Sequence, residues 1–207
     1  MASVEPLFYF DFGSPNAYLS HRVIPHIEAR TGVRFKYVPV LLGGLFKLSS
    51  NQSPMLAFAG IPLKLAYQRL EMQRFVVKHG LTKFKSNPYF PVNTLALMRG
   101  AVAADAEGIL PAYVESMYHF MWEEPRKLDD LAVLTQTLAE AKLPTERILA
   151  RSQEQAIKDR LVANTQSAYE HGAFGSPSFL VGTELFFGKD RLREVEEEIV
   201  AQKARAS

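Results

Sequence analysis

The pattern of apolar and polar positions predicts two strands near the start of the chain. Leu7–Phe12 is almost continuously apolar and aromatic, which is typical of a buried strand, and residues 33–39 alternate with period two. Between them, Ser14 is a good helix cap and Pro15 suits the first position of a helix, which we expect to run to Gly32. Two strands joined through a helix in one sheet run parallel, with a right-handed crossover.

Residues 44–152 carry a different pattern, in which apolar residues recur three or four positions apart. Four such sets predict helices: Leu63/Tyr67/Leu70, Leu95/Met98/Val102, Val114/Met117/Met121 and Leu131/Leu134/Leu138. No convincing strand pattern interrupts them. We therefore expect an all-helical insertion over this part of the chain.

Strand patterns return near the C-terminus. A helical pattern over residues 152–170 ends at a break that contains glycine and proline, and residues 178–181 and 185–188 then indicate a hairpin. A last helix is expected to start at Asp190.

The order of these elements predicts an α/β protein with a mixed four-stranded sheet covered by helices. Residues 1–43 and 153–207 would form the sheet domain, with residues 44–152 as a helical insertion domain. The turn at Ser14 and the X-Pro bond before the third strand would then lie at the same end of the sheet. Ligands tend to bind at such an end in α/β folds.

Composition and charge narrow the class of protein. The chain has 207 residues, of which 47% are hydrophobic and 22% charged, and this ordinary globular balance excludes a disordered or fibrous chain. The formal net charge is +2, and Lys and Arg occur singly or in pairs, so the basic stripe of a nucleic-acid-binding protein is missing. We expect no nucleic-acid partner.

The chain contains no cysteine. It therefore cannot form a disulfide, exchange thiols with its own groups, build a Cys zinc site or use a Cys nucleophile. Any sulfur chemistry has to come from a bound molecule.

The N-terminus carries no basic segment followed by an apolar stretch, and no apolar run approaches the ~18 residues of a membrane span. We expect a cytoplasmic protein with no membrane partner. No metal site is expected either, because no H-E-x-x-H motif occurs and His21 and His26 point about 140° apart on their predicted helix.

Three residues combine suitable chemistry with a suitable place. Ser14 would lie at a helix N-terminus, beside unpaired amides that stabilise an anion, or would be an ordinary cap. If the bond between Ser176 and Pro177 is cis, the amide and carbonyl of Ser176 would turn outward and pair with a small peptide. Asp190 would hold an amino-acid-like end of a ligand, or again be only a cap.

Several short motifs carry a resemblance to a known family. They are Phe8-Tyr9-Phe10-Asp11-Phe12-Gly13-Ser14-Pro15 with Tyr18-Leu19, Leu41-Leu42-Gly43-Gly44, Asn51-Gln52, Phe90-Pro91-Val92-Asn93-Thr94, Gly172-Ala173-Phe174-Gly175-Ser176-Pro177 and Gly188-Lys189-Asp190-Arg191-Leu192. Over residues 6–200 the chain resembles the 2-hydroxychromene-2-carboxylate isomerases and the kappa-class glutathione transferases. The resemblance implies a thioredoxin-like fold with a helical insertion, related to the DsbA disulfide oxidoreductases, in which serine replaces the first cysteine of the C-x-x-C motif.

The resemblance implies glutathione as cofactor and assigns roles to single residues. Ser14 would donate its hydroxyl to the glutathione sulfur, and a hydrogen bond of ~1.5–3 kcal/mol to a charged acceptor lowers a thiol pKa of ~8.5 by about 1–2 units. The remaining positions are Asn51, Lys64, Ser176, Lys189 and Asp190 for glutathione, and Lys47 for an aromatic substrate.

The reaction implied by the resemblance is the conversion of a chromene carboxylate to trans-o-hydroxybenzylidenepyruvate in bacterial aromatic degradation. The thiolate would act as a reversible nucleophile, so that glutathione is not consumed. A glutathione-consuming transferase or peroxidase and a non-catalytic thioredoxin-like binding module are the alternatives. The family also implies a homodimer. Two departures from its usual pattern are Asn16, where an aromatic residue is common, and Ser176, where a larger apolar residue is common.

Overall fold

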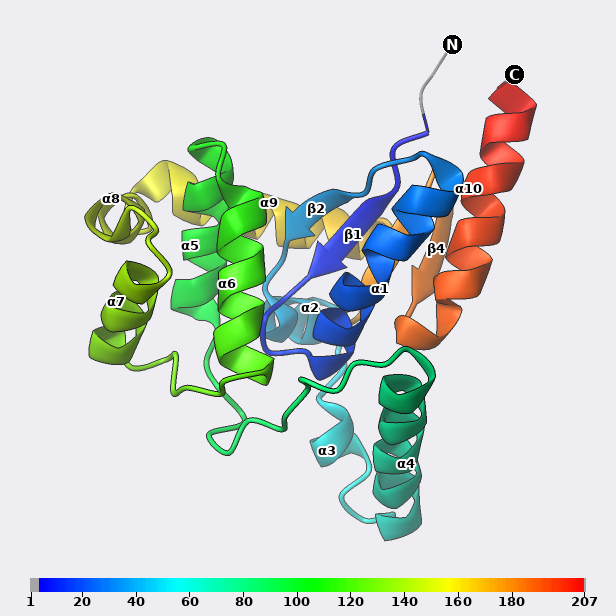
Figure 1. Cartoon of the computed structure of the whole chain (residues 1–207), viewed down its shortest axis with the longest axis horizontal. Helices are drawn as coiled ribbons and strands as arrows, with labels where there is room; N and C mark the ends of the chain where they lie inside the picture. The colour runs from blue at the N-terminus through cyan, green and yellow to red at the C-terminus, as the bar shows by residue number, and fades with distance from the viewer. Residues whose placement is uncertain (1–3, 207) are drawn as a thin grey trace.

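The computed structural model describes residues 4–206 and contains one four-stranded sheet with helices around it (Figure 1). The strands are β1 (Leu7–Phe10), β2 (Lys36–Pro39), β3 (Ser178–Val181) and β4 (Glu184–Phe187). Their order in the sheet is β2-β1-β3-β4. β1 runs parallel to β2 and antiparallel to β3, and β3 runs antiparallel to β4, so the predicted mixed sheet is confirmed.

The helices occupy the rest of the described chain. They are α1 (Pro15–Thr31), α2 (Leu42–Leu48), α3 (Pro54–Ala57), α4 (Pro62–Lys78), α5 (Leu95–Ala106), α6 (Leu110–Trp122), α7 (Leu131–Glu140), α8 (Thr145–Arg151), α9 (Gln155–Glu170), the 3-10 turn η1 (Lys189–Arg191) and α10 (Leu192–Ala206). Within residues 4–206, no strand lies between β2 and β3, which confirms the all-helical insertion.

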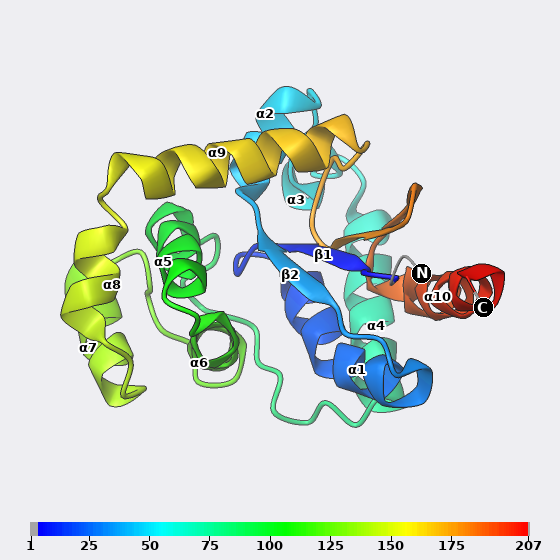
Figure 2. The same cartoon turned by 90° about the horizontal axis from the view of Figure 1, so that it is seen from above.

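The side chains of β1 alternate between two apolar layers. Phe8 and Phe10 are fully buried in the main core, and the Phe8 ring stacks on that of its cross-strand neighbour Phe179 with 5.2 Å between the centroids. Tyr9 points to the other face and packs in a smaller cluster with Leu45 of α2. Figure 2 shows α9 crossing this second face, with α1 on the opposite side. Aromatic burial on both faces fixes the register of β1 at the centre of the sheet.

Some element boundaries differ from the sequence predictions. The last helix begins at Leu192 and not at Asp190, because residues Lys189–Arg191 form a separate 3-10 turn. The helix predicted from Ser152 begins at Gln155. The short helices α2, α3 and α8 were not predicted, since four to seven residues are too few to show a helical period.

Helix α4 is present where its pattern predicts it, but most of its apolar residues face outward. Leu63 is 84% exposed, and Tyr67 and Leu70 are exposed as well, whereas Phe75 is buried. Met55 and Leu56 of the preceding helix α3 are exposed as well.

The division into a sheet domain and an insertion domain stays a prediction, and residues 1–3 and 207 of the proposed sheet domain lie outside the described residues. No helix among residues 4–206 is both long and apolar enough to cross a membrane.

Candidate functional site

Ser14 lies where β1 turns into α1, and its hydroxyl has two partners. It accepts a hydrogen bond from the backbone amide of Ala17 at 3.2 Å, so Ser14 is the cap of α1. It also donates to the backbone carbonyl of Ser176 at 2.8 Å. The turn at the start of α1 and the loop before β3 therefore meet at this hydroxyl, as the sequence predicts.

The bond between Ser176 and Pro177 is cis, so the condition set for the expectation about Ser176 is met. The expectation that both polar groups of Ser176 face outward was wrong for the carbonyl, because this group is the acceptor for Ser14. The amide of Ser176 donates to no acceptor in residues 4–206. The Ser176 side chain is buried and accepts a hydrogen bond from the amide of Asp11 at 3.1 Å, so it holds the loop against β1.

The Asp11 side chain holds the turn before Ser14 in place by hydrogen bonds, a role that the sequence analysis missed. One carboxylate oxygen accepts from the amide of Gly13 at 2.8 Å and the other from the amide of Leu42 at 2.7 Å. Burial raises the pKa of Asp11, while these two amides act in the opposite direction. The carboxylate thus ties the Ser14 turn to the start of α2. An acidic residue inside an otherwise apolar strand segment was the signal for it.

Asn51 reaches the same loop from the segment after α2. Its side-chain amide donates to the carbonyl of Phe174 at 3.1 Å. The Phe174 ring in turn contacts that of Phe187, with 4.4 Å between their centroids, and both rings are partly exposed. Asn51 is therefore placed beside the loop that carries Ser176.

Lys189 and Asp190 lie next to the loop that carries Ser176. The amide of Gly188 donates to the carbonyl of Pro177 at 3.0 Å, which places the start of η1 beside the cis-proline turn. The Lys189 side chain is only 4% exposed, and its Nζ lies 2.5 Å from a carboxylate oxygen of Asp190 and 5.0 Å from the centroid of the Phe75 ring. Asp190 is exposed and lies inside η1, whose N-cap is Gly188, and two residues before α10 begins. The interpretation of Asp190 as a helix cap was wrong.

The structure does not bring the two other lysines into contact with this group. Lys47 is exposed on α2 and makes no hydrogen bond or ion pair within residues 4–206. Lys64 Nζ lies 3.6 Å from the centroid of the Phe58 ring and is also on the surface. Their assignment to a substrate and to glutathione stays a prediction.

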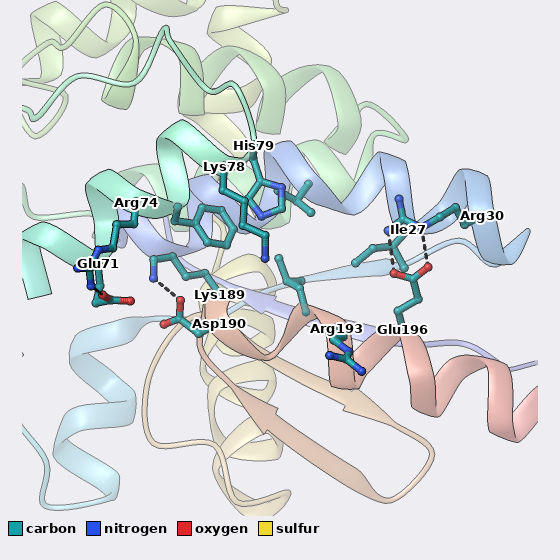
Figure 3. Close-up of a pocket in the computed structure, with 13 residues that line it drawn as sticks. Ile27, Arg30, Glu71, Arg74, Lys78, His79, Lys189, Asp190, Arg193 and Glu196 are labelled. Atoms are coloured by element: carbon teal, nitrogen blue, oxygen red, sulfur yellow. Dashed lines mark hydrogen bonds and ion pairs between the residues drawn. The ribbon is translucent and has the colours of Figure 1, made fainter.

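A cavity of about 420 Å³ opens between α1, α4 and the start of α10. Figure 3 shows Lys189 and Asp190 at one end of it, together with Glu71 and Arg74 of α4. Phe75 and Leu192 contribute buried apolar surface to the wall. In the described part of the chain, no group of three or more His, Cys, Asp or Glu side chains is arranged to hold a metal ion.

These groups together are suited to an extended small peptide. The Ser14 hydroxyl contacts the residue whose backbone amide has no acceptor among residues 4–206, Ser176. The buried ammonium group of Lys189 and the exposed carboxylate of Asp190 directly follow Gly188, which is hydrogen-bonded to Pro177. A backbone amide pairs with a carbonyl of an extended ligand, and opposite charges suit a zwitterionic end.

Comparisons with known proteins agree with this architecture. The sequence matches the DSBA-like thioredoxin domain over residues 7–200. It is 27% identical over 188 residues to the 2-hydroxychromene-2-carboxylate isomerase of Pseudomonas putida, covering 89% of both chains. It is 26% identical over 202 residues to glutathione S-transferase kappa 1 of Rattus norvegicus, covering 91% of this chain and 87% of the relative.

Solved structures show the same fold. A 2-hydroxychromene-2-carboxylate isomerase structure superposes with a TM-score of 0.79 at 24% identity and covers 98% of this chain and 99% of that one. A probable DsbA oxidoreductase from Streptomyces coelicolor gives a TM-score of 0.67 at 19% identity, covering 96% and 89%. With its four-stranded sheet, its helical insertion and a match over almost its whole length, the chain belongs to the DSBA-like thioredoxin domain family.

Proposed function

We propose that this protein is a glutathione-dependent isomerase of small conjugated aromatic carboxylates, of the 2-hydroxychromene-2-carboxylate type named for its relatives. One observation carries the proposal: the Ser14 hydroxyl, at the N-terminus of α1, meets a loop whose Ser176 amide has no acceptor within residues 4–206. A cysteine-free chain of this family has no thiol at that point, so the sulfur has to be brought in by a ligand.

The residues at the site fit glutathione. The Ser176 amide is available for the cysteinyl carbonyl, and Lys189 and Asp190 offer the opposite charges that a γ-glutamyl end requires. Asn51 lies close enough to the loop to serve the same ligand. When bound, glutathione would supply a thiolate that adds to the conjugated system and leaves again, with no net redox change.

The part of Ser14 is to stabilise negative charge next to it. In the structure its hydroxyl donates a hydrogen bond to the neutral carbonyl of Ser176. A thiolate at this position would compete for that hydrogen bond, because hydrogen bonds to charged acceptors are stronger. The N-terminus of α1 adds its partial positive charge. The Asp11 carboxylate keeps the turn in place by holding the amides of Gly13 and Leu42.

The proposal also includes roles for two lysines that do not contact the groups described above. Lys47, which is exposed on α2, would interact with the carboxylate of the aromatic substrate, and Lys64 with glutathione. We propose a cytoplasmic homodimer. The exposed apolar residues of α3 and α4, among them Leu63, support this proposal, because such side chains are suited to a contact between two copies.

Two experiments test the proposal. Calorimetric titration of the purified protein with reduced glutathione is expected to give saturable binding with proton release near neutrality. Incubation with a 2-hydroxychromene-2-carboxylate and a catalytic amount of glutathione should then bring the substrate to equilibrium with its isomer while the thiol concentration stays constant. Loss of one thiol per product would identify a transferase instead, and no binding at millimolar glutathione would refute the cofactor assignment.

A further inference from the structure

The cavity beside Lys189 contains a second ion pair that the proposed function does not use. Glu71 and Arg74, one turn apart on α4, contact one another through their carboxylate and guanidinium groups. They line the same end of the cavity as Lys189 and Asp190, as Figure 3 shows. A different pair, Arg30 with Glu196, lies at the opposite end.

The charges at the Lys189 end are balanced. Glu71 and Asp190 contribute two carboxylates there, and Arg74 and Lys189 two cations, while Lys78 and His79, at the end of α4, line the cavity farther along. A simple anion such as a dicarboxylate or a phosphate would therefore meet two like charges as well as the opposite ones. A zwitterion meets none of this repulsion, because its ammonium group can lie between Glu71 and Asp190 and its carboxylate between Arg74 and Lys189. The buried Phe75 ring, over which the Lys189 amine lies, offers apolar surface to a short methylene chain.

The Glu71–Arg74 pair and the Lys189–Asp190 pair lie close enough for their charges to interact. The pKa of Glu71 is lowered, chiefly by its hydrogen bond to Arg74 and also by the positive charge of Lys189. Helix α4 of the insertion and η1 after the sheet thus contribute to one charged pocket. The connection to the loop is short, since the Gly188 amide is bonded to the carbonyl of Pro177.

We infer that Glu71 and Arg74 complete a four-residue pocket for the α-amino-acid end of the bound γ-glutamyl peptide. This inference rests on the proposed function and extends it, because it makes α4 a determinant of which thiol is accepted. A thiol without the γ-glutamyl group would leave the pocket empty and gain nothing from it.

The test compares two ligands on the whole protein by calorimetry: reduced glutathione and cysteinylglycine, which lacks the γ-glutamyl group. Arg74→Gln and Glu71→Gln should each weaken glutathione binding by about tenfold, the effect of losing roughly 1.4 kcal/mol from one charged contact. Neither variant should change the binding of cysteinylglycine. Arg30→Gln is the matched control, because it breaks an ion pair at the far end of the same cavity and should leave both affinities unchanged.

The other outcomes are distinguishable. If wild type binds glutathione and both α4 variants bind it equally well, the inference is overturned and the proposed function stands. If the variants weaken both ligands alike, or if Arg30→Gln acts as strongly as they do, the pocket is not specific for the γ-glutamyl end and the inference is again overturned. If wild type does not bind glutathione, the proposed function fails and the inference falls with it.

Discussion

Substitution of Ser14 by alanine tests the centre of the site, and the structure refines the size of the expected effect. The hydroxyl that would stabilise a thiolate already donates to the carbonyl of Ser176 at 2.8 Å. A hydrogen bond to a charged acceptor contributes ~1.5–3 kcal/mol, and a neutral one ~0.5–1.5 kcal/mol, so exchanging the second for the first gains about 1–1.5 kcal/mol. At ~1.36 kcal/mol per unit, the pKa of the bound thiol should fall by about one unit through Ser14.

The assay is an ultraviolet titration of the thiolate of bound glutathione, with wild type and Ser14→Ala both saturated. The bound thiol should have a pKa about one unit higher in the variant than in wild type, and in wild type it should lie at least one unit below the ~8.5 of the free thiol. The partial charge of α1 is present in both proteins and cancels in this comparison.

A control is needed because Ser14 also caps α1, so its loss should lower the free energy of unfolding by about 1 kcal/mol. Asp130→Ala removes a comparable cap, at the start of α7 and without any contact to the site. This control should lose similar stability and leave the thiol pKa unchanged. Equal thiol pKa values in wild type and Ser14→Ala, with equal glutathione occupancy, would refute the reasoning and leave Ser14 as a structural cap.

Three further predictions concern the scaffold. Asp11→Asn keeps the shape but offers one acceptor where two amides donate, so denaturant unfolding should show a loss of about 1–3 kcal/mol; unchanged stability would contradict this account. The hydrogen bond from His21 lowers the pKa of Glu115 to about 2, so its contribution is present above the ordinary value of 4.5 and is lost as the pH falls from there to about 2. Glu115→Gln should abolish that part of the acid dependence, by no more than about 1 kcal/mol because the carboxylate is 59% exposed; an unaltered pH profile would be the contrary result. Leu63→Glu should convert a dimer to monomers in light scattering, while Val162→Glu, at a position that is also exposed but lies on α9, should not; a monomeric wild type would exclude the dimer.

The main elements of the fold could be predicted from the sequence because their patterns are local. The apolar run of β1, the period-two segment of β2 and the helical sets of the insertion each correspond to an element of the structure. The prediction was wrong at Asp190, since a 3-10 turn and a helix N-terminus carry the same short-range signals. The exposed stripe on α4 was beyond prediction too, because a helical pattern specifies an apolar face and not what covers it.

Only those site residues that lie at turns recognisable in the sequence could be predicted. Ser14 and Ser176 stand out as serines next to prolines at two turns, and the order of the elements places both turns at one end of the sheet. Contacts such as that of Asn51 with Phe174 depend on the path of a long insertion, which no local pattern specifies. Glu71 and Arg74 look like solvated helix surface in the sequence, and only packing shows that they face Lys189.

The absence of cysteine has a consequence for how such a site controls its reaction. A redox member of a thioredoxin-like family carries its sulfur on the helix that Ser14 begins here, and the reactive atom is then fixed by the chain. Under the proposed function the reactive sulfur of this cysteine-free chain would arrive with a ligand, so the groups that select the ligand would also decide whether the reaction occurs. The Ser176 amide could donate to a carbonyl of any extended peptide, and the Ser14 hydroxyl to any thiolate. If the proposed function holds, we expect the charged groups around Lys189, which do not contact the sulfur, to contribute to the discrimination among thiols.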